Sequence, residues 1–261
     1  MKPFLVDVPV LILFFNRPQQ LSQVFEQVRN ARPSKLFLYQ DGPRSEHDLP
    51  GIKACREVTD QIDWDCEVHR MYQEKNYGCD PSEYISQKWA FSMVDKCIVL
   101  EDDDVPSVSF FTFCKEMLDK YEQDTRITMI AGFNNEEITP DVPYDYFFAS
   151  TFSIWGWASW KRVIDQWDEH YTFLEDKFNM QQLEQLIKER KFRKDFIYMC
   201  HRHKENNKAY YETIFHASML FNSGLAIVPT RNMINNLGVT ADSTHFAGSV
   251  HTLPKGYRRI F

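Results

Sequence analysis

Short apolar runs alternate with amphipathic helical patterns along the first 130 residues, and this alternation restricts the chain to a small set of folds. The run Val8–Phe15 is closed by Asn16-Arg17-Pro18, a pattern typical of a strand that is buried on both faces. Three further segments have the composition of strands: Lys35–Tyr39, Glu67–Met71 and Cys97–Leu100. Because helical patterns separate these strands, they predict right-handed βαβ units and a mostly parallel sheet.

The segments between the strands carry the expected helical signals. Pro18 suits the first turn of a helix, and apolar residues then recur at helical spacing through Val28. Further helices are predicted over Ile52–Ile62, after Pro81, after the acidic run at 101–104, near Asn179–Lys191 and over Tyr211–Phe221, with a strand near Leu225–Pro229. We therefore expect one α/β domain over 1–261, with a regular half at 1–135 and a less regular half at 136–261.

Polar residues follow three of the predicted strands. Arg17 follows the first, Asp41 the second, and Glu101-Asp102-Asp103-Asp104 the fourth. Parallel α/β sheets bind ligands beyond the carboxyl ends of their strands. Four adjacent carboxylates repel one another, and a hard cation such as Mg²⁺ or Mn²⁺ would offset that repulsion. The alternative is a solvated acidic loop that caps the following helix through Asp104 or Ser107.

Charge and composition exclude several partners and compartments. The net charge of −7 argues against a nucleic-acid partner, which requires a basic surface. No run approaches the roughly 20 apolar residues that cross a membrane. Six scattered cysteines without a C-x-x-C pair predict reduced thiols and a cytoplasmic protein. The cations and aromatics of Lys255–Phe261 are compatible with at most a peripheral contact with the inner face of the cell membrane.

The order of these motifs resembles a known family. A strand followed by Asn16-Arg17-Pro18, a strand followed by Asp41-Gly-Pro43, and a strand followed by the acidic run are succeeded by Trp155–Trp160 and Asn235–His245. This order resembles GT-A fold glycosyltransferases related to N-acetylglucosaminyltransferase I and to bacterial polysaccharide-assembly enzymes. The resemblance implies a Rossmann-like GT-A fold with a donor-binding first half and an acceptor-binding second half.

The resemblance also implies an activity and a cofactor. The expected reaction is metal-dependent transfer of a sugar from a nucleotide diphosphate donor, a UDP-sugar, to a hydroxyl of a glycan or lipid-linked saccharide acceptor, with inversion. The expected cofactor is Mn²⁺ or Mg²⁺.

Roles for individual residues follow from the same resemblance. Arg17 would contact the diphosphate or ribose, Asp41 the uracil or ribose, and Asp102 the ribose, although Asp41 is equally suited to shaping the turn before Gly42-Pro43. Asp103 would bind the metal. Because Asp104 is an additional acidic residue in the run, it is the alternative metal ligand. Trp157 would lie beneath the donor sugar and acceptor. His245 would reach the metal or diphosphate as its loop closes, or serve as a structural histidine.

The base of an inverting transfer is assigned to Glu212. It follows an aromatic residue, precedes an apolar helix, and stands where many relatives carry an aspartate. An exposed glutamate that complements the helix dipole is the alternative role, and His216, one turn further along, is the alternative base.

Two other functions fit parts of the pattern. A sugar-nucleotide-forming nucleotidyltransferase would also contain a parallel sheet with acidic metal ligands, but it opens with a glycine-rich loop that the Asn16-Arg17-Pro18 turn lacks. A non-catalytic sugar- or metal-binding module remains the third hypothesis, although the spaced ligands of a calcium loop are absent.

Overall fold

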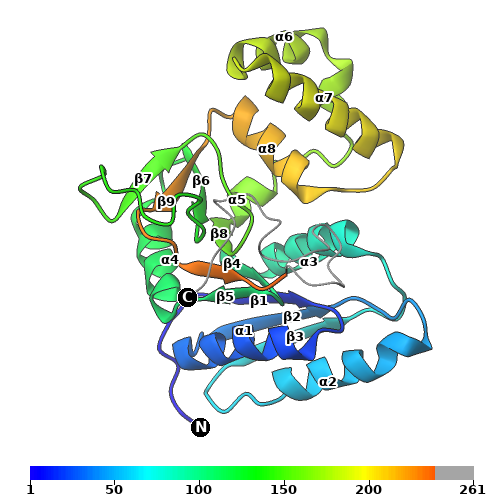
Figure 1. Cartoon of the computed structure of the whole chain (residues 1–261), viewed down its shortest axis with the longest axis vertical. Coiled ribbons are helices and arrows are strands. Elements are labelled where there is room, and N and C mark those ends of the chain that lie inside the picture. The colour runs from blue at the N-terminus through cyan, green and yellow to red at the C-terminus, as the bar shows by residue number, and fades with distance from the viewer. Residues whose placement is uncertain (239–261) are drawn as a thin grey trace.

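The computed structural model describes residues 1–238 and shows an α/β architecture with an eight-stranded mixed sheet in the order β3-β2-β1-β4-β8-β6-β9-β7 (Figure 1). The strands of this sheet are β1 (Val10–Phe14), β2 (Lys35–Gln40), β3 (Glu67–Tyr72), β4 (Lys96–Glu101), β6 (Ile127–Ala131), β7 (Tyr146–Ala149), β8 (Trp157–Trp160) and β9 (Leu225–Pro229). A separate pair joins β5 (Asp104–Pro106) to β10 (Ile234–Asn236) in antiparallel register.

Helices flank this sheet, and the last three extend beyond it (Figure 1). They are α1 (Pro18–Ala31), α2 (Leu49–Thr59), α3 (Cys79–Met93), α4 (Val108–Lys120), α5 (Lys161–Ile164), α6 (Lys177–Leu186), α7 (Arg190–Glu205) and α8 (Tyr211–Phe221), with 3₁₀ turns at Glu46–Asp48 and Thr172–Glu175. Figure 1 shows α1 and α2 on one side of β1–β3 and α3 on the other. Among residues 1–238, none of these helices is both long and apolar enough to cross a membrane.

The predicted alternation of strands and helices in the first half is confirmed. β1 is buried along its whole length, and it pairs in parallel with both β2 and β4. Pro18 opens α1, and the side chains at Leu21, Val24 and Val28 form its buried stripe. Buried parallel strands are continuously apolar because helices cover both of their faces, which explains why this half is readable from sequence.

The second half departs from a purely parallel sheet. β8 lies antiparallel between β4 and β6, and β7 lies antiparallel to β9 at the edge. The aromatic segment before Trp160 therefore supplies two strands that the sequence did not reveal. The single helix expected near Asn179–Lys191 is instead two helices, because the chain leaves helical geometry at Ile187 and Glu189 caps α7 through its carboxylate.

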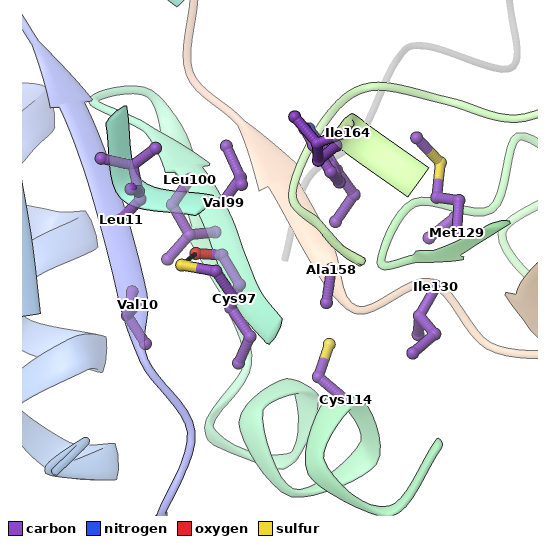
Figure 2. Packing of buried hydrophobic residues seen from close by; sticks show 14 of the residues in the cluster. Val10, Leu11, Cys97, Val99, Leu100, Cys114, Met129, Ile130, Ala158 and Ile164 are labelled. Atoms are coloured by element: carbon purple, nitrogen blue, oxygen red, sulfur yellow. Dashed lines mark hydrogen bonds between the residues drawn. The ribbon is translucent and has the colours of Figure 1, made fainter. Parts of the chain in front are cut away.

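A continuous apolar core joins the two halves. Figure 2 shows side chains of β1 and β4 beside Ala158 of β8, with Ile130 of β6 and Cys114 of α4 close by. Gly156 has a φ of +60°, and a Cβ there would lie 2.5 Å from the Cδ1 atom of Ile234. Only glycine fits this close contact with Ile234 without strain. Gly156 is therefore required at the turn into β8.

The sheet order creates a topological switch point between β1 and β4. The chain moves outward from β1 to β2 and β3 and then returns to add β4 on the other side of β1. The register places Phe14 opposite Gln40 and Leu13 opposite Glu101. The three polar segments that follow these strands consequently meet at one edge, where open α/β sheets bind ligands.

Candidate functional site

Arg17 and the acidic run form a buried ion-pair network at the switch point. The guanidinium contacts both oxygens of Asp102, with Nε 3.3 Å from Oδ2, and its Nη2 lies 2.8 Å from Oδ2 of Asp103. Burial disfavours the charged form of Arg17, but the charges of the two aspartates outweigh it and raise the pKa of the guanidinium. Burial likewise raises the pKa of Asp102 to about 6, against the opposing effect of Arg17.

Asp103 and Asp104 have different surroundings. Asp104 is completely buried: its Oδ2 accepts the Gly156 N–H at 2.9 Å, and its Oδ1 accepts from the Asn236 amide at 3.0 Å. Asp103 is 7% exposed, and its Oδ1 accepts from the same amide at 3.3 Å. Each Asp103 oxygen thus has one close partner, which leaves lone pairs for a cation. The Asp104 oxygens also have one partner each, so of the two aspartates Asp103 is the more accessible to a cation only through its slight exposure.

Asp41 organises the loop beside this network. Its carboxylate accepts the N–H groups of Gly42, Tyr77 and Gly78 and the side-chain amide of Asn76, at 2.8 to 3.2 Å. Most of its hydrogen-bonding capacity is therefore taken up by the protein. This geometry favours the turn-forming role, and a direct contact with uracil or ribose stays a prediction.

These segments border one cavity of about 820 Å³. Its wall includes Asn16, Arg17, Asp41, Arg44, Gly78, Glu83, Glu101 and Asp102. Guanidinium and carboxylate groups in this wall create a polar site large enough for a nucleotide-sized ligand. The predicted residues Arg17, Asp41 and Asp102 are thus brought together.

A second carboxylate group lies beside this cavity. Single carboxylate oxygens of Asp80, Glu83 and Glu212 all lie within 4.8 Å of one another, so the three residues could hold a metal ion. Asp80 and Glu83 lie three residues apart on one face at the start of α3, and Glu212 lies in the first turn of α8. The Oε2 atom of Glu83 is buried and has no hydrogen-bond partner, while its Oε1 accepts a weak bond from the Cys79 thiol at 3.4 Å.

Burial and the proximity of like charges raise the pKa of Glu83, Glu101 and Glu212. Burial, followed by the charge of Glu212, raises the pKa of Glu83 well above its usual range. Burial, followed by the charge of Glu83, does the same to the pKa of Glu101. The pKa of Glu212 rises to about 7, first through burial and then through the charge of Asp80. A carboxyl that titrates near neutrality is suited to accept a proton during a reaction.

Three other predicted residues have different placements. Trp157 is 1% exposed and packs against the rings of Phe91 and Tyr211, so it belongs to the core and does not line the cavity. His216, the alternative base, packs against the rings of Phe192 and Phe196 between helices, and burial lowers its pKa to about 4. His245 lies outside the described residues.

The sequence reasoning missed Asp80, Glu83 and Arg44. The spacing Asp80-x-x-Glu83 at the start of a helix does place two carboxylates on one face, but this pattern is common on solvated helices. Only the packing of α3 against α8 reveals that Glu212 lies beside them.

Comparison with known proteins identifies no relative: no protein-family model matches the chain, and no curated protein matches it significantly.

Proposed function

We propose that this chain is a metal-dependent glycosyltransferase of the GT-A type. It would transfer a sugar from a nucleotide diphosphate donor, a UDP-sugar, to a hydroxyl of a glycan or lipid-linked saccharide. The observation that carries the proposal is the juxtaposition of two groups. Arg17, Glu101, Asp102 and Glu83 line a cavity of about 820 Å³. The Glu212 carboxylate, whose pKa is about 7, lies beside Glu83.

The cavity offers complementary charge for a nucleotide diphosphate. Arg17 and Arg44 line it with planar cations, which suit the oxygens of phosphate groups. Arg44 is anchored by Asp48, with Nη2 2.7 Å from Oδ1, and it lies over the ring of Phe15. These contacts hold the cation in place before a ligand arrives.

The residues present fit a divalent cation. Asp103 would hold it, because its oxygens retain lone pairs and its side chain is not fully enclosed. A hard ion at that carboxylate would neutralise charge on the diphosphate as it leaves. A Cβ at position 238 would lie 2.5 Å from the Asp103 Oδ2 atom, so Gly238 leaves space at this carboxylate.

Glu212 would be the base of an inverting displacement. The acceptor hydroxyl would attack the anomeric carbon while its proton passes to the Glu212 carboxylate, and the bond from that carbon to the diphosphate oxygen would break. Glu212 would thus hold the proton, and the nucleotide diphosphate would be the leaving group. General-base assistance of this kind contributes roughly 10²–10⁴ in rate.

Ligand-induced stabilisation tests the donor assignment. The melting temperature is measured with UDP, GDP or CDP, each with and without Mn²⁺, because a ligand that binds only the folded state raises it by mass action. We expect the largest rise for UDP with Mn²⁺ and its loss in Asp103→Ala, whereas Asp141→Ala, at an exposed aspartate, behaves as the parent. Tighter binding of GDP or CDP, or an undiminished response in Asp103→Ala, contradicts the proposal.

The same screen separates the two places where a metal could bind. If Asp80→Asn loses the Mn²⁺ response and Asp103→Ala keeps it, the metal belongs to the carboxylate group of Asp80, Glu83 and Glu212. In that case Glu212 would be a ligand and not a base.

A further inference from the structure

Helices α6 and α7 form a basic segment on an acidic protein. Residues 177–208 contain nine lysines and arginines against four aspartates and glutamates, whereas the whole chain has a net charge of −7. Figure 1 shows α6 and α7 together at one end of the molecule, beyond α8 and away from the central sheet. Positive charge is therefore concentrated on one projecting part of the chain.

The outer face of α7 combines this charge with exposed apolar side chains. Lys191, Lys194, Tyr198 and Arg202 follow one another at intervals of three or four residues, which places them along one side of the helix. Tyr198 is 61% exposed, and Phe192 and Met199, seven residues apart, are 42% and 45% exposed. We call these six residues the α7 face.

The cations of the α7 face are not engaged within the described part of the protein. Among residues 1–238, Lys191, Lys194 and Arg202 take part in no salt bridge, in contrast to Lys204, which pairs with Glu175 at 2.7 Å. The Arg202 guanidinium donates only a long bond to the Tyr198 hydroxyl, at 3.4 Å. The exposed acids near this face are Glu189, Asp195 and Glu205, and the charge of Lys191 acts on Glu189. Nine cations against four acids in residues 177–208 still leave positive charge predominant.

We propose that the α7 face binds the surface of a membrane containing anionic phospholipids. Cations interleaved with tyrosine, phenylalanine and methionine on an exposed helix match the interfacial region of a bilayer, where cations meet phosphate and apolar side chains enter the acyl boundary. A nucleic acid fits less well, since the remainder of the chain is strongly acidic and would repel its backbone.

The position of the α7 face relative to the candidate site gives this contact a consequence. α8, which begins with Tyr211 and Glu212, packs against both α6 and α7, and the rings of Phe192 and Phe196 contact His216 of α8. A membrane bound at α7 would thus hold the helix of Glu212 near the bilayer. This consequence, access to a lipid-linked acceptor, rests on the proposed function; the membrane contact itself does not.

Vesicle co-sedimentation of the full chain tests the contact. One set of vesicles contains phosphatidylcholine alone. The other contains phosphatidylcholine with roughly 30–40% phosphatidylglycerol, whose headgroups give the vesicle surface a strong negative potential. We expect binding to the anionic vesicles only, and weaker binding at about 0.5 M salt, where surface charges are screened. Lys191→Glu/Lys194→Glu should reduce the partition coefficient about 30-fold or more, because each lysine near such a surface contributes roughly fivefold.

Matched variants make the outcome decisive. Lys53→Glu/Arg126→Glu changes the net charge equally at two exposed cations elsewhere and should bind as the parent does. Tyr198→Ser should weaken binding without changing the charge, and thermal melting confirms that each variant is folded. The proposal is overturned if the parent ignores anionic vesicles, if both double variants lose binding equally, or if only Arg258→Glu/Arg259→Glu abolishes it.

Vesicle binding and nucleotide binding are separate measurements. Anionic vesicles bound by a chain that ignores UDP and Mn²⁺ would leave the α7 face supported and the glycosyltransferase proposal refuted. The reverse result would refute the α7 face alone.

Discussion

Replacing Glu212 by glutamine removes a carboxylate beside the cavity whose pKa is raised to about 7. Burial and the charge of Asp80 place that pKa at about 7, so the carboxylate is about half ionised at pH 7, roughly a tenth ionised at pH 6 and about a hundredth at pH 5. If the ionised form is the base, the rate falls about fivefold from pH 7 to pH 6 and about tenfold from pH 6 to pH 5. A glutamate at its ordinary value would keep the rate level to about pH 5.

The expected loss in Glu212→Gln is about 10²–10⁴ in kcat, or roughly 3–5 kcal/mol in the activation barrier. Donor affinity should stay near that of the parent, because the interaction is made mainly in the transition state. The assay measures UDP released from a panel of UDP-sugars with Mn²⁺ between pH 5 and 9, with water as the acceptor where no saccharide is found. Glu175→Gln, at an exposed carboxylate elsewhere, is the matched control.

Two results would refute the reasoning. One is a rate in the parent that is level from pH 8 to pH 5, since the group that titrates near 7 would then have no part in the reaction. The other is a Glu212→Gln variant that keeps more than about a tenth of parental turnover, which is above the range for a lost general base. Retained anomeric configuration in the product, determined by NMR, would exclude the inverting displacement itself.

Three further predictions concern the surrounding residues. Because the folded-state pKa of Glu83 is raised, the free energy of unfolding should rise as pH falls from 8 to 6.5, by at most about 1.4 kcal/mol per pH unit for this one group. Thermal melting of Glu83→Gln should show a higher stability at pH 8 and a flatter slope, and an unchanged slope contradicts this cause. Arg17→Lys keeps the charge but not the fork toward Asp102, so calorimetry should show UDP binding with Mn²⁺ weakened roughly 10- to 100-fold, and parental affinity would exclude Arg17 from the site. Gly156→Ala, at a φ of +60° and with its Cβ against Ile234, should lower the free energy of unfolding by about 2–4 kcal/mol, and denaturation midpoints within error of the parent would contradict the packing described.

Two kinds of titrating group limit the pH range in which the Glu83 prediction can be tested, because they change the free energy of unfolding in opposite directions. Carboxyls with raised pKa stabilise the folded state as pH falls toward their unfolded values, so their effect continues below pH 6.5. His216, whose pKa is lowered to about 4 by burial, destabilises the folded state as pH falls below its unfolded value near 6.5. The carboxyl effect is therefore cleanest between pH 8 and 6.5.

The regular half of the fold and the edge where the candidate site lies follow from local sequence patterns. A strand covered on both faces must be apolar along its whole length, and a helix on such a sheet must carry an apolar stripe, so β1 and α1 could be recognised from local patterns. Arg17 and the acidic run could be expected near each other, because the carboxyl ends of neighbouring parallel strands share one edge.

Only the tertiary structure decided which of these residues face the cavity and which support the fold. Asp104 and Trp157 are buried, and Asp41 is occupied by its own loop, although each belongs to a motif that suggested ligand contact. The group of Asp80, Glu83 and Glu212 joins segments about 130 residues apart in the chain. Burial and the proximity of like charges arise from packing between distant elements, and these two effects raise the pKa of Glu212.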